Sequence, residues 1–133
     1  MNKTEPVSAR TITQDEYFIG HKACAGCGGS IAVRLALKVL GPDTFSVLPA
    51  GCMAAVGFIY PQMAFTSNAI ISTFPGAASM ASGIAAAGRI LGLKPHHTIV
   101  FAGDGGTADI GLQALSGVID RGDRVIYVCY DNE

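Results

Sequence analysis

A glycine-rich turn built around an aspartate is the first group of residues whose types and spacing suggest chemistry. The turn, Gly103-Asp104-Gly105-Gly106, follows one apolar run of the chain, and Asn132 follows the next one. Glycines let a backbone approach a diphosphate closely, but the Asp104 carboxylate would repel that anion unless a cation lay between them. Because Asp and Asn oxygens suit Mg²⁺, Asp104 and Asn132 predict a magnesium ion that bridges to a diphosphate.

The same turn fits a second kind of site. The spacing Gly103-x-Gly105-x-x-Ala108 satisfies the looser dinucleotide fingerprint, which keeps a nicotinamide or flavin site as an alternative. The carboxylate of Asp104 weighs against this alternative, since a dinucleotide loop has no need of an anionic group beside the pyrophosphate.

Three cysteines offer soft ligands. Cys24 and Cys27 form a CxxC pair, which taken alone is half of a zinc site, a redox pair or half of an iron-sulfur site. Cys52 lies in the loop after Pro49, and we expect this loop at the carboxyl edge of a sheet, beside the glycine-rich turn. A third thiol at that edge favours a metal or a cluster over a dithiol. Cys129, inside an apolar run, is predicted to be a small buried hydrophobe.

The apolar runs on either side of the glycine-rich turn predict the elements that position these groups. Segments 98–102 and 124–130 have the character of buried strands, and 108–122 between them that of a helix, which is typical of a βαβ unit in a parallel sheet. Further strands are predicted over 44–50 and 65–73, and further helices over 30–41 and 76–92. We therefore predict an α/β fold, a parallel sheet with helices on both faces.

Two of the predicted helices carry more detailed expectations. Ser30 is placed to cap the first one and Gly41 to end it. The buried face of that helix is predicted to hold Ile31, Leu35 and either Leu37 or Val39. In the helix over 76–92, small residues repeat every four positions, which suits close packing against the helix's own sheet or against another subunit. They are Ser79, Gly83 and Ala87.

The composition excludes several classes of protein and points to a shared surface. Of 133 residues 14% are charged, the formal net charge is -1 and no basic cluster occurs, so the electrostatic footprint of a nucleic-acid binder is missing. The stretch 44–88 has no charged residue or histidine, yet prolines and polar residues interrupt it too often for a membrane span. Burial against the rest of a larger protein explains it better. The first twenty residues lack the apolar run of a signal peptide, which predicts a cytoplasmic protein.

The motifs resemble those of a known family. GDGGTADIG with the later YDN resembles the thiamine-diphosphate motif, and HKACAGCGGS with PAGC resembles the β subunit of the 2-oxoacid:ferredoxin oxidoreductases, the pyruvate type in particular. The resemblance implies the following cofactor-binding residues: Ala50, Gly51, Cys52, Met53, Gly103, Asp104, Gly105, Gly106 and Asn132. It also implies that Asp104 and Asn132 bind Mg²⁺. Cys24, Cys27 and Cys52 would bind a [4Fe-4S] cluster, whose fourth ligand has no counterpart in this sequence.

The same resemblance implies a thiamine-diphosphate-binding fold and a thiamine-dependent oxidative decarboxylation of a 2-oxoacid to acyl-coenzyme A. Electrons would pass through the cluster to ferredoxin, and an α subunit, with γ or δ subunits, would be a partner. Because such β subunits are longer, we expect an N-terminal arm over 1–19 and a thiamine-diphosphate and iron-sulfur domain over 20–133 that is incomplete at its C-terminus. We expect the isolated chain to be inactive, and a non-catalytic half-module that folds only against a partner stays open as an alternative.

Overall fold

Four parallel strands form the sheet of the computed structural model, which describes residues 8–94 and 96–132. The strands lie in the order β2-β1-β3-β4, so the two most buried ones, β1 and β3, are central. Their bounds are Thr44–Pro49 (β1), Asn68–Ser72 (β2), His97–Gly103 (β3) and Ile126–Tyr130 (β4). This order and direction confirm the parallel sheet that the apolar runs predict. The prediction was possible because strands covered on both faces have near-continuous apolar sequences.

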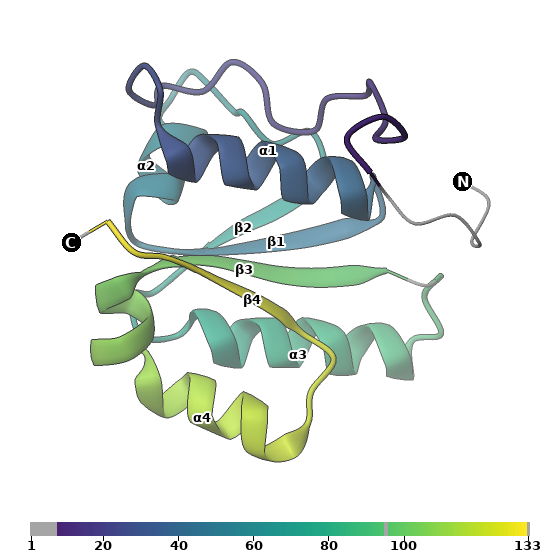
Figure 1. Ribbon diagram of the computed structural model, residues 1–133. Helices are drawn as coiled ribbons and strands as arrows, with labels where there is room; N and C mark the ends of the chain where they lie inside the picture. The colour runs from purple at the N-terminus through teal and green to yellow at the C-terminus, as the bar shows by residue number, and fades with distance from the viewer. Residues whose placement is uncertain (1–7, 95, 133) are drawn as a thin grey trace.

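Helices cover both faces of this sheet, as Figure 1 shows. Helices α1 and α2 lie on one face and α3 and α4 on the other, which confirms the predicted α/β class. Their bounds are Gly28–Leu40 (α1), Cys52–Phe58 (α2), Ala77–Ile90 (α3) and Leu112–Arg121 (α4). None of the helices in the described residues is long and apolar enough to cross a membrane.

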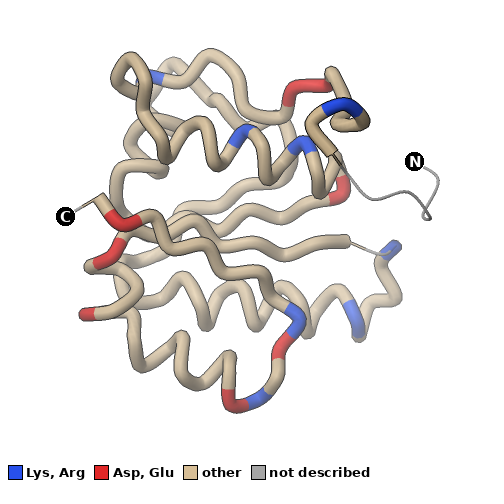
Figure 2. Tube along the Cα trace, in the orientation of Figure 1, with Lys and Arg blue, Asp and Glu red and all other residues tan. Residues whose placement is uncertain are grey.

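Charged residues lie mainly towards the two ends of the strands. Figure 2 shows acidic positions where β3 and β4 end, whereas basic and acidic positions lie together where α3 ends and β4 begins. Asp104 follows β3 and Asp131 follows β4, whereas Arg89 lies in the last turn of α3 and Arg124 just precedes β4. The two ends of the sheet therefore offer different electrostatic environments.

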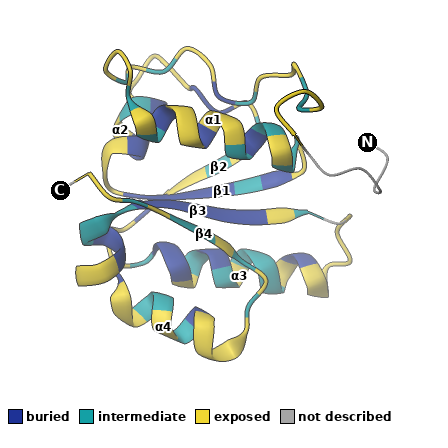
Figure 3. Cartoon of the chain, in the orientation of Figure 1, coloured by how far each residue is buried: buried dark blue, intermediate teal, exposed yellow. Residues whose placement is uncertain are grey.

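An apolar cluster fills the space on each face of the sheet. Burial is concentrated in β1, β3 and the inner sides of the helices, as Figure 3 shows. The cluster under α1 and α2 consists of Phe18, Val33, Leu37, Leu48, Met53, Ala54, Ala64, Phe65, Ile99 and Phe101. The cluster under α3 is smaller and consists of Val47, Ala77, Ala81, Val100 and Ala102.

The predicted N-terminal arm over 1–19 is joined to the domain at its far end. The Ile19 N–H donates to the Ala64 carbonyl at 2.9 Å, and the Phe18 ring is fully buried with its centroid 4.8 Å from that of Phe65. The arm's first seven residues lie outside the described residues. Phe18 is thus a core residue, which the expectation of an arm over 1–19 did not include.

Helix α1 differs from expectation at its start and in its buried face. It begins at Gly28, with Cys27 at the N-cap position, so Ser30 does not cap it; the Ser30 hydroxyl instead donates back to the Cys27 carbonyl at 2.8 Å. The helix packs inward through Val33 and Leu37. Leu37 is buried, as one of the two alternatives for the third position predicts, and Val39, the other alternative, is about half exposed. Ile31 and Leu35, which were predicted to be buried, are also about half exposed. Apolar residues occupy two sides of this helix, so periodicity alone did not identify the inner one.

The segment after β1 and the segment after β3 also depart from the prediction. Helix α2 begins at Cys52, where the sequence suggests only a loop, because its seven residues are too few for a clear period. The helix predicted over 108–122 is preceded by a single π-helical turn, Gly105–Asp109, and its regular part begins at Leu112. Strand β2 is shorter than the predicted 65–73.

The small residues of α3 face away from the sheet. Ser79, Gly83 and Ala87 are exposed, and a Cβ added at Gly83 would meet nothing within 4 Å. The helix packs on the sheet through other positions, Ala77 and Ala81 among them. The expectation that the stripe packs on the helix's own sheet is therefore wrong, and contact with another subunit stays a prediction.

Candidate cofactor-binding site

A cavity of about 260 Å³ lies at the carboxyl edge of the sheet, where the sequence predicts the site. The carboxyl ends of β1, β3 and β4 meet there, because parallel strands end at the same edge. The cavity is lined by Pro49, Ala50, Gly51, Cys52, Phe74, Gly103, Asp104, Gly105, Gly106, Tyr130 and Asn132. The structure thus brings together every predicted cofactor-binding residue except Met53.

The glycine-rich turn leaves little room for side chains at this edge. A Cβ at Gly106 would stand 3.2 Å from Cε2 of Phe74, and one at Gly103 would stand 3.4 Å from Cε2 of Tyr130. The turn is held from within by Thr107, whose hydroxyl donates to the Gly103 carbonyl at 2.6 Å. These positions therefore suit glycine, and the turn presents backbone to the cavity. A diphosphate that binds main-chain groups fits such a surface.

Asp104 and Asn132 meet in this cavity as the sequence predicts. Asp104 is half-buried at the start of the π-helical turn, and the Asn132 amide nitrogen donates to Sγ of Cys52 at 3.6 Å. The Asn132 amide oxygen lies 3.7 Å from the place of a Cβ on Gly103, so it faces the glycine-rich turn. A carboxylate and an amide oxygen at one edge fit the hard-ligand preference of Mg²⁺. The cavity is smaller than the roughly 300–1,000 Å³ of pockets that enclose whole ligands, so it fits the diphosphate end of a cofactor.

Tyr130 lines the cavity although the motifs did not single it out. Its hydroxyl accepts a hydrogen bond from the Met53 N–H at 3.3 Å, and burial raises the pKa of its phenol. In the sheet Tyr130 pairs with Gly103, so the strand register could have indicated that it lies beside the turn. Phe74 was missed as well. It follows the carboxyl end of β2, and the rule that ligands bind beyond strand ends could have found it.

The Met53 side chain lies in the core, whereas its neighbours Ala50, Gly51 and Cys52 line the cavity. Its side chain is 1% exposed and belongs to the core under α1, with its Cε 3.0 Å from where a Cβ on Gly29 would stand. Met53 is the second residue of α2, so its side chain projects to the helix's inner side while Cys52 remains at the cavity. The Met53 side chain therefore does not line the cavity, and its main-chain N–H reaches Tyr130 instead. Its contact with the cofactor stays a prediction.

The CxxC segment packs against α2, the helix that begins with Cys52. The Lys22 N–H donates to the Val56 carbonyl at 3.1 Å, and Sγ of Cys27 lies 3.8 Å from the same Gly29 position that Met53 approaches. Hydrogen bonding by the Ser30 backbone amide, at the start of α1, lowers the pKa of the Cys27 thiol, while burial opposes this. Cys24 and Cys52 are exposed. Within the described part of the chain, no three His, Cys, Asp or Glu side chains are grouped closely enough to hold a metal.

Cys129 is exposed, which corrects the expectation of a buried thiol. It lies on β4, an edge strand of the described sheet, and pairs with Ala102 of β3. Apolar sequence on both faces made the strand look fully covered, but its outer side has no neighbouring strand in the described residues.

Comparisons with known proteins agree with this geometry. The family described as thiamine pyrophosphate enzyme, C-terminal TPP binding domain, matches residues 49–133. Pyruvate synthase subunit PorB of Methanothermobacter thermautotrophicus is 49% identical over 123 residues, which cover 92% of this chain and 43% of that protein. The chain belongs to the β-subunit family of the 2-oxoacid:ferredoxin oxidoreductases. The resemblance carried by the motifs is therefore confirmed.

Other members of this β-subunit family are similar over the same extent. Pyruvate synthase subunit PorB of Pyrococcus horikoshii is 46% identical over 133 residues, covering 92% of this chain and 40% of that protein. Ketoisovalerate oxidoreductase subunit VorB of Pyrococcus abyssi is 42% identical over 125 residues, covering 90% of this chain and 40% of that protein. The chain spans less than half the length of these curated relatives. Because the thiamine pyrophosphate match includes the glycine-rich turn, it favours the thiamine interpretation over the nicotinamide or flavin one.

Proposed function

We propose that the full-length protein is the thiamine-diphosphate-binding subunit of a pyruvate:ferredoxin-type oxidoreductase. In this proposal it takes part in the oxidative decarboxylation of pyruvate to acetyl-coenzyme A, with electrons delivered to ferredoxin. The observation that carries the proposal is the meeting of Asp104, Asn132 and the glycine-rich turn in one cavity. Pyruvate is preferred over other 2-oxoacids because relatives named pyruvate synthase subunit reach 49% identity, against 42% for one named for ketoisovalerate.

The residues of the cavity have separate roles in this proposal. The Asp104 carboxylate and the Asn132 amide oxygen hold Mg²⁺, and the glycines at 103, 105 and 106 let the diphosphate reach the main chain. Thiamine diphosphate, when bound, supplies the nucleophilic carbon chemistry that removes CO₂ from a 2-oxoacid. Ala50, Gly51 and Cys52 form the wall beside it. The catalytic carboxylate comes from a partner, since none of the described cavity residues other than Asp104 is acidic.

Cys24, Cys27 and Cys52 are proposed as ligands of a [4Fe-4S] cluster. Their support is the packing of the CxxC segment on α2 and the lowered pKa of Cys27, since clusters bind thiolates. The three thiols are not yet grouped for ligation in the described chain, so binding requires the CxxC segment to adjust and a fourth thiol to come from elsewhere. The α, γ or δ subunits, ferredoxin and coenzyme A are proposed partners, and the cytoplasm is the predicted location.

Substitution of the proposed magnesium ligand tests the thiamine site. Asp104→Asn in the full-length complex should weaken Mg²⁺-dependent thiamine diphosphate binding by about tenfold or more, because a charge-assisted contact is lost. Binding is measured by titration at fixed free Mg²⁺. Asp109→Asn, in the same π-helical turn but away from the cavity, is the matched control and should bind as the unmodified protein does. Unchanged thiamine diphosphate binding by Asp104→Asn would contradict the proposal.

Metal and sulfide analysis tests the cluster. The purified complex should contain iron and acid-labile sulfide, and Cys24→Ser, Cys27→Ser or Cys52→Ser should each lower the content by about four iron atoms per subunit. Cys129→Ser serves as the control and should leave the content unchanged. Zinc in place of iron, or full iron content in the three variants, would contradict the assignment.

A further inference from the structure

A second cavity, of about 830 Å³, opens at the opposite end of the sheet from the cofactor cavity. The last turns of α3, the segment that leads into β3 and the turn before β4 enclose it. Strand β3 runs from one cavity to the other, His97–Gly103, a length of about 20 Å at roughly 3.3 Å per residue. The volume of this second cavity lies within the roughly 300–1,000 Å³ of small-molecule sites. None of the residues implied by the thiamine and cluster motifs lines it.

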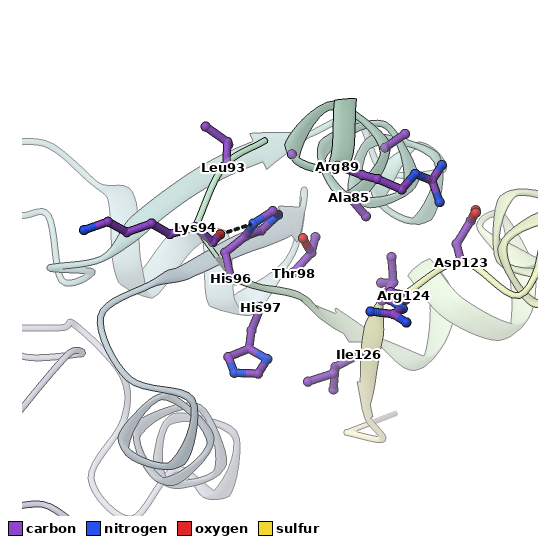
Figure 4. Close-up of a pocket in the computed structure, with 13 residues that line it drawn as sticks. Ala85, Arg89, Leu93, Lys94, His96, His97, Thr98, Asp123, Arg124 and Ile126 are labelled. Atoms are coloured by element: carbon purple, nitrogen blue, oxygen red, sulfur yellow. Dashed lines mark hydrogen bonds between the residues drawn. The ribbon is translucent and has the colours of Figure 1, made fainter. Parts of the chain in front are cut away.

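Two arginines line this cavity, and neither is held in a contact ion pair. Arg89 reaches it from α3 and Arg124 from the start of β4, as Figure 4 shows. Neither forms an ion pair within the residues that the structure describes, where the paired cations are Arg34, Lys38 and Arg121. Two guanidinium groups that are free of contact ion pairs suit a phosphate, which they can bind with paired hydrogen bonds.

The one carboxylate that lines the cavity is already engaged. Asp123 accepts a hydrogen bond from the Ser82 hydroxyl at 2.6 Å and lies 3.0 Å from Nη2 of Arg121. These contacts and the nearby charge of Arg89 lower its pKa, with the Ser82 hydrogen bond as the largest cause. They also tie the turn before β4 to α3, which fixes the backbone that carries Arg124. Asp123 therefore partly offsets the positive charge of Arg89, while Ser82 and Arg121 hold the carboxylate in place.

Thr98 adds an unsatisfied polar group to the same cavity. Its side chain is 3% exposed and its hydroxyl has no hydrogen-bond partner among the described residues. A buried hydroxyl without a partner is destabilising, so it is rare unless another group satisfies it. Because the oxygen itself is closed to solvent, a bound molecule would reach it only if neighbouring wall side chains move, so Thr98 adds to the arginines and does not define the site by itself.

The rest of the wall combines Lys94, His96 and His97 with apolar side chains. The His96 ring packs on α3 where a Cβ at Gly88 would overlap it, and it meets the Phe45 ring edge-on at 5.3 Å. Lys94 extends away from the cavity in Figure 4, although its carbonyl accepts a hydrogen bond from Nδ1 of His96 at 3.1 Å. The apolar part of the wall consists of Ala85, Ala86, Leu93, Val125 and Ile126.

We propose that this cavity binds a small phosphorylated molecule of nucleotide size. Arg89 and Arg124 hold the phosphate groups, the Thr98 hydroxyl bonds to a polar group deeper in the cavity, and the apolar wall takes the organic part. The proposal does not depend on the thiamine site, because no residue is shared between the two cavities.

Calorimetric titration of the full-length complex with ADP, inorganic pyrophosphate and adenosine tests the proposal. The complex is first saturated with thiamine diphosphate, Mg²⁺ and coenzyme A, so that diphosphates do not enter those sites. ADP should bind saturably, pyrophosphate more weakly and adenosine very weakly. Arg89→Gln and Arg124→Gln should each weaken ADP binding by about tenfold or more, because each removes a charged hydrogen-bonding group. Arg10→Gln, the same charge change outside the cavity, should bind ADP as the unmodified complex does.

Thr98→Val separates binding from structure. Removing an unsatisfied buried hydroxyl should leave the thermal midpoint unchanged or raise it, while ADP binding weakens. Absence of saturable ADP binding, or unchanged binding in both arginine variants, would overturn the proposal. Equal affinities for pyrophosphate and ADP would overturn the nucleotide-sized occupant, and unchanged ADP binding by Thr98→Val would overturn the role of that hydroxyl.

Discussion

Tyr130 joins two segments of the cofactor cavity through one hydroxyl. Helix α2 starts after Gly51 and has no side-chain cap of its own, yet the Met53 N–H near its start donates to Tyr130 at 3.3 Å. A helix start carries unpaired N–H groups that need acceptors. Tyr130 supplies one from β4, two residues before Asn132, and so connects the Cys52 turn to the proposed magnesium ligand.

Tyr130→Phe should loosen the start of α2. The variant keeps the ring but removes the acceptor, which should cost about 1–3 kcal/mol locally and speed amide exchange over Cys52–Phe58. Hydrogen exchange of the full-length complex, followed by mass spectrometry, measures this. Tyr60→Phe, at a 91% exposed position, is the control and should leave exchange unchanged. Identical exchange in the two variants would mean that the hydroxyl does not stabilise the helix.

The π-helical turn after β3 depends on glycine at a point outside the motif. A Cβ at Gly111 would overlap the carbonyl oxygen of Gly106, because the wider turn brings these backbones together. The Gly106 carbonyl also accepts a hydrogen bond from the Tyr127 hydroxyl at 3.4 Å. The element that carries Asp104 is therefore shaped by residues on both sides of it.

Gly111→Ala should distort this turn. Overpacking of this kind costs about 1–3 kcal/mol, so we expect a lower thermal midpoint and weaker thiamine diphosphate binding in the full-length protein. Gly83→Ala is a matched helix-region control. Its Cβ would meet nothing within 4 Å, and alanine should stabilise the helix by about 0.5–1 kcal/mol. A Gly111→Ala protein that binds the cofactor normally would contradict the proposed tightness of the turn.

The molecule as a whole exposes apolar surface that its few charges do not balance. Ile31, Leu35 and Val39 form one exposed row along α1, and Ile70 and Ile71 of the edge strand β2 are each 45% exposed. Only 14% of the residues are charged. Large exposed apolar patches mark surfaces that pack against other protein. This agrees with a chain that covers about 43% of a relative's length, and the half-module alternative stays a prediction.

The 133-residue chain on its own should therefore self-associate and lack 2-oxoacid-dependent dye reduction. Sedimentation velocity should detect oligomers, and Ile31→Lys with Leu35→Lys should reduce them, since the added charges raise the cost of burying that row. Val39, at the end of the row, is left unsubstituted in this variant. A monomer that is active by itself would contradict both expectations.

The sequence by itself determined the parallel α/β class and the edge of the sheet at which the site lies. Of the nine cofactor-binding residues that the family resemblance implies, eight line the cavity. The fold class and the edge were predicted from the sequence pattern itself. These depend on local signals, since apolar runs predict buried strands and parallel strands end at one edge. Tertiary structure decided the rest: which side of α1 is buried, the turn of Met53 into the core, the exposure of Cys129, and the meeting of Arg89, Thr98 and Arg124. Those outcomes depend on which surfaces face each other across the sheet, and contacts between distant segments leave no periodic signal in the chain.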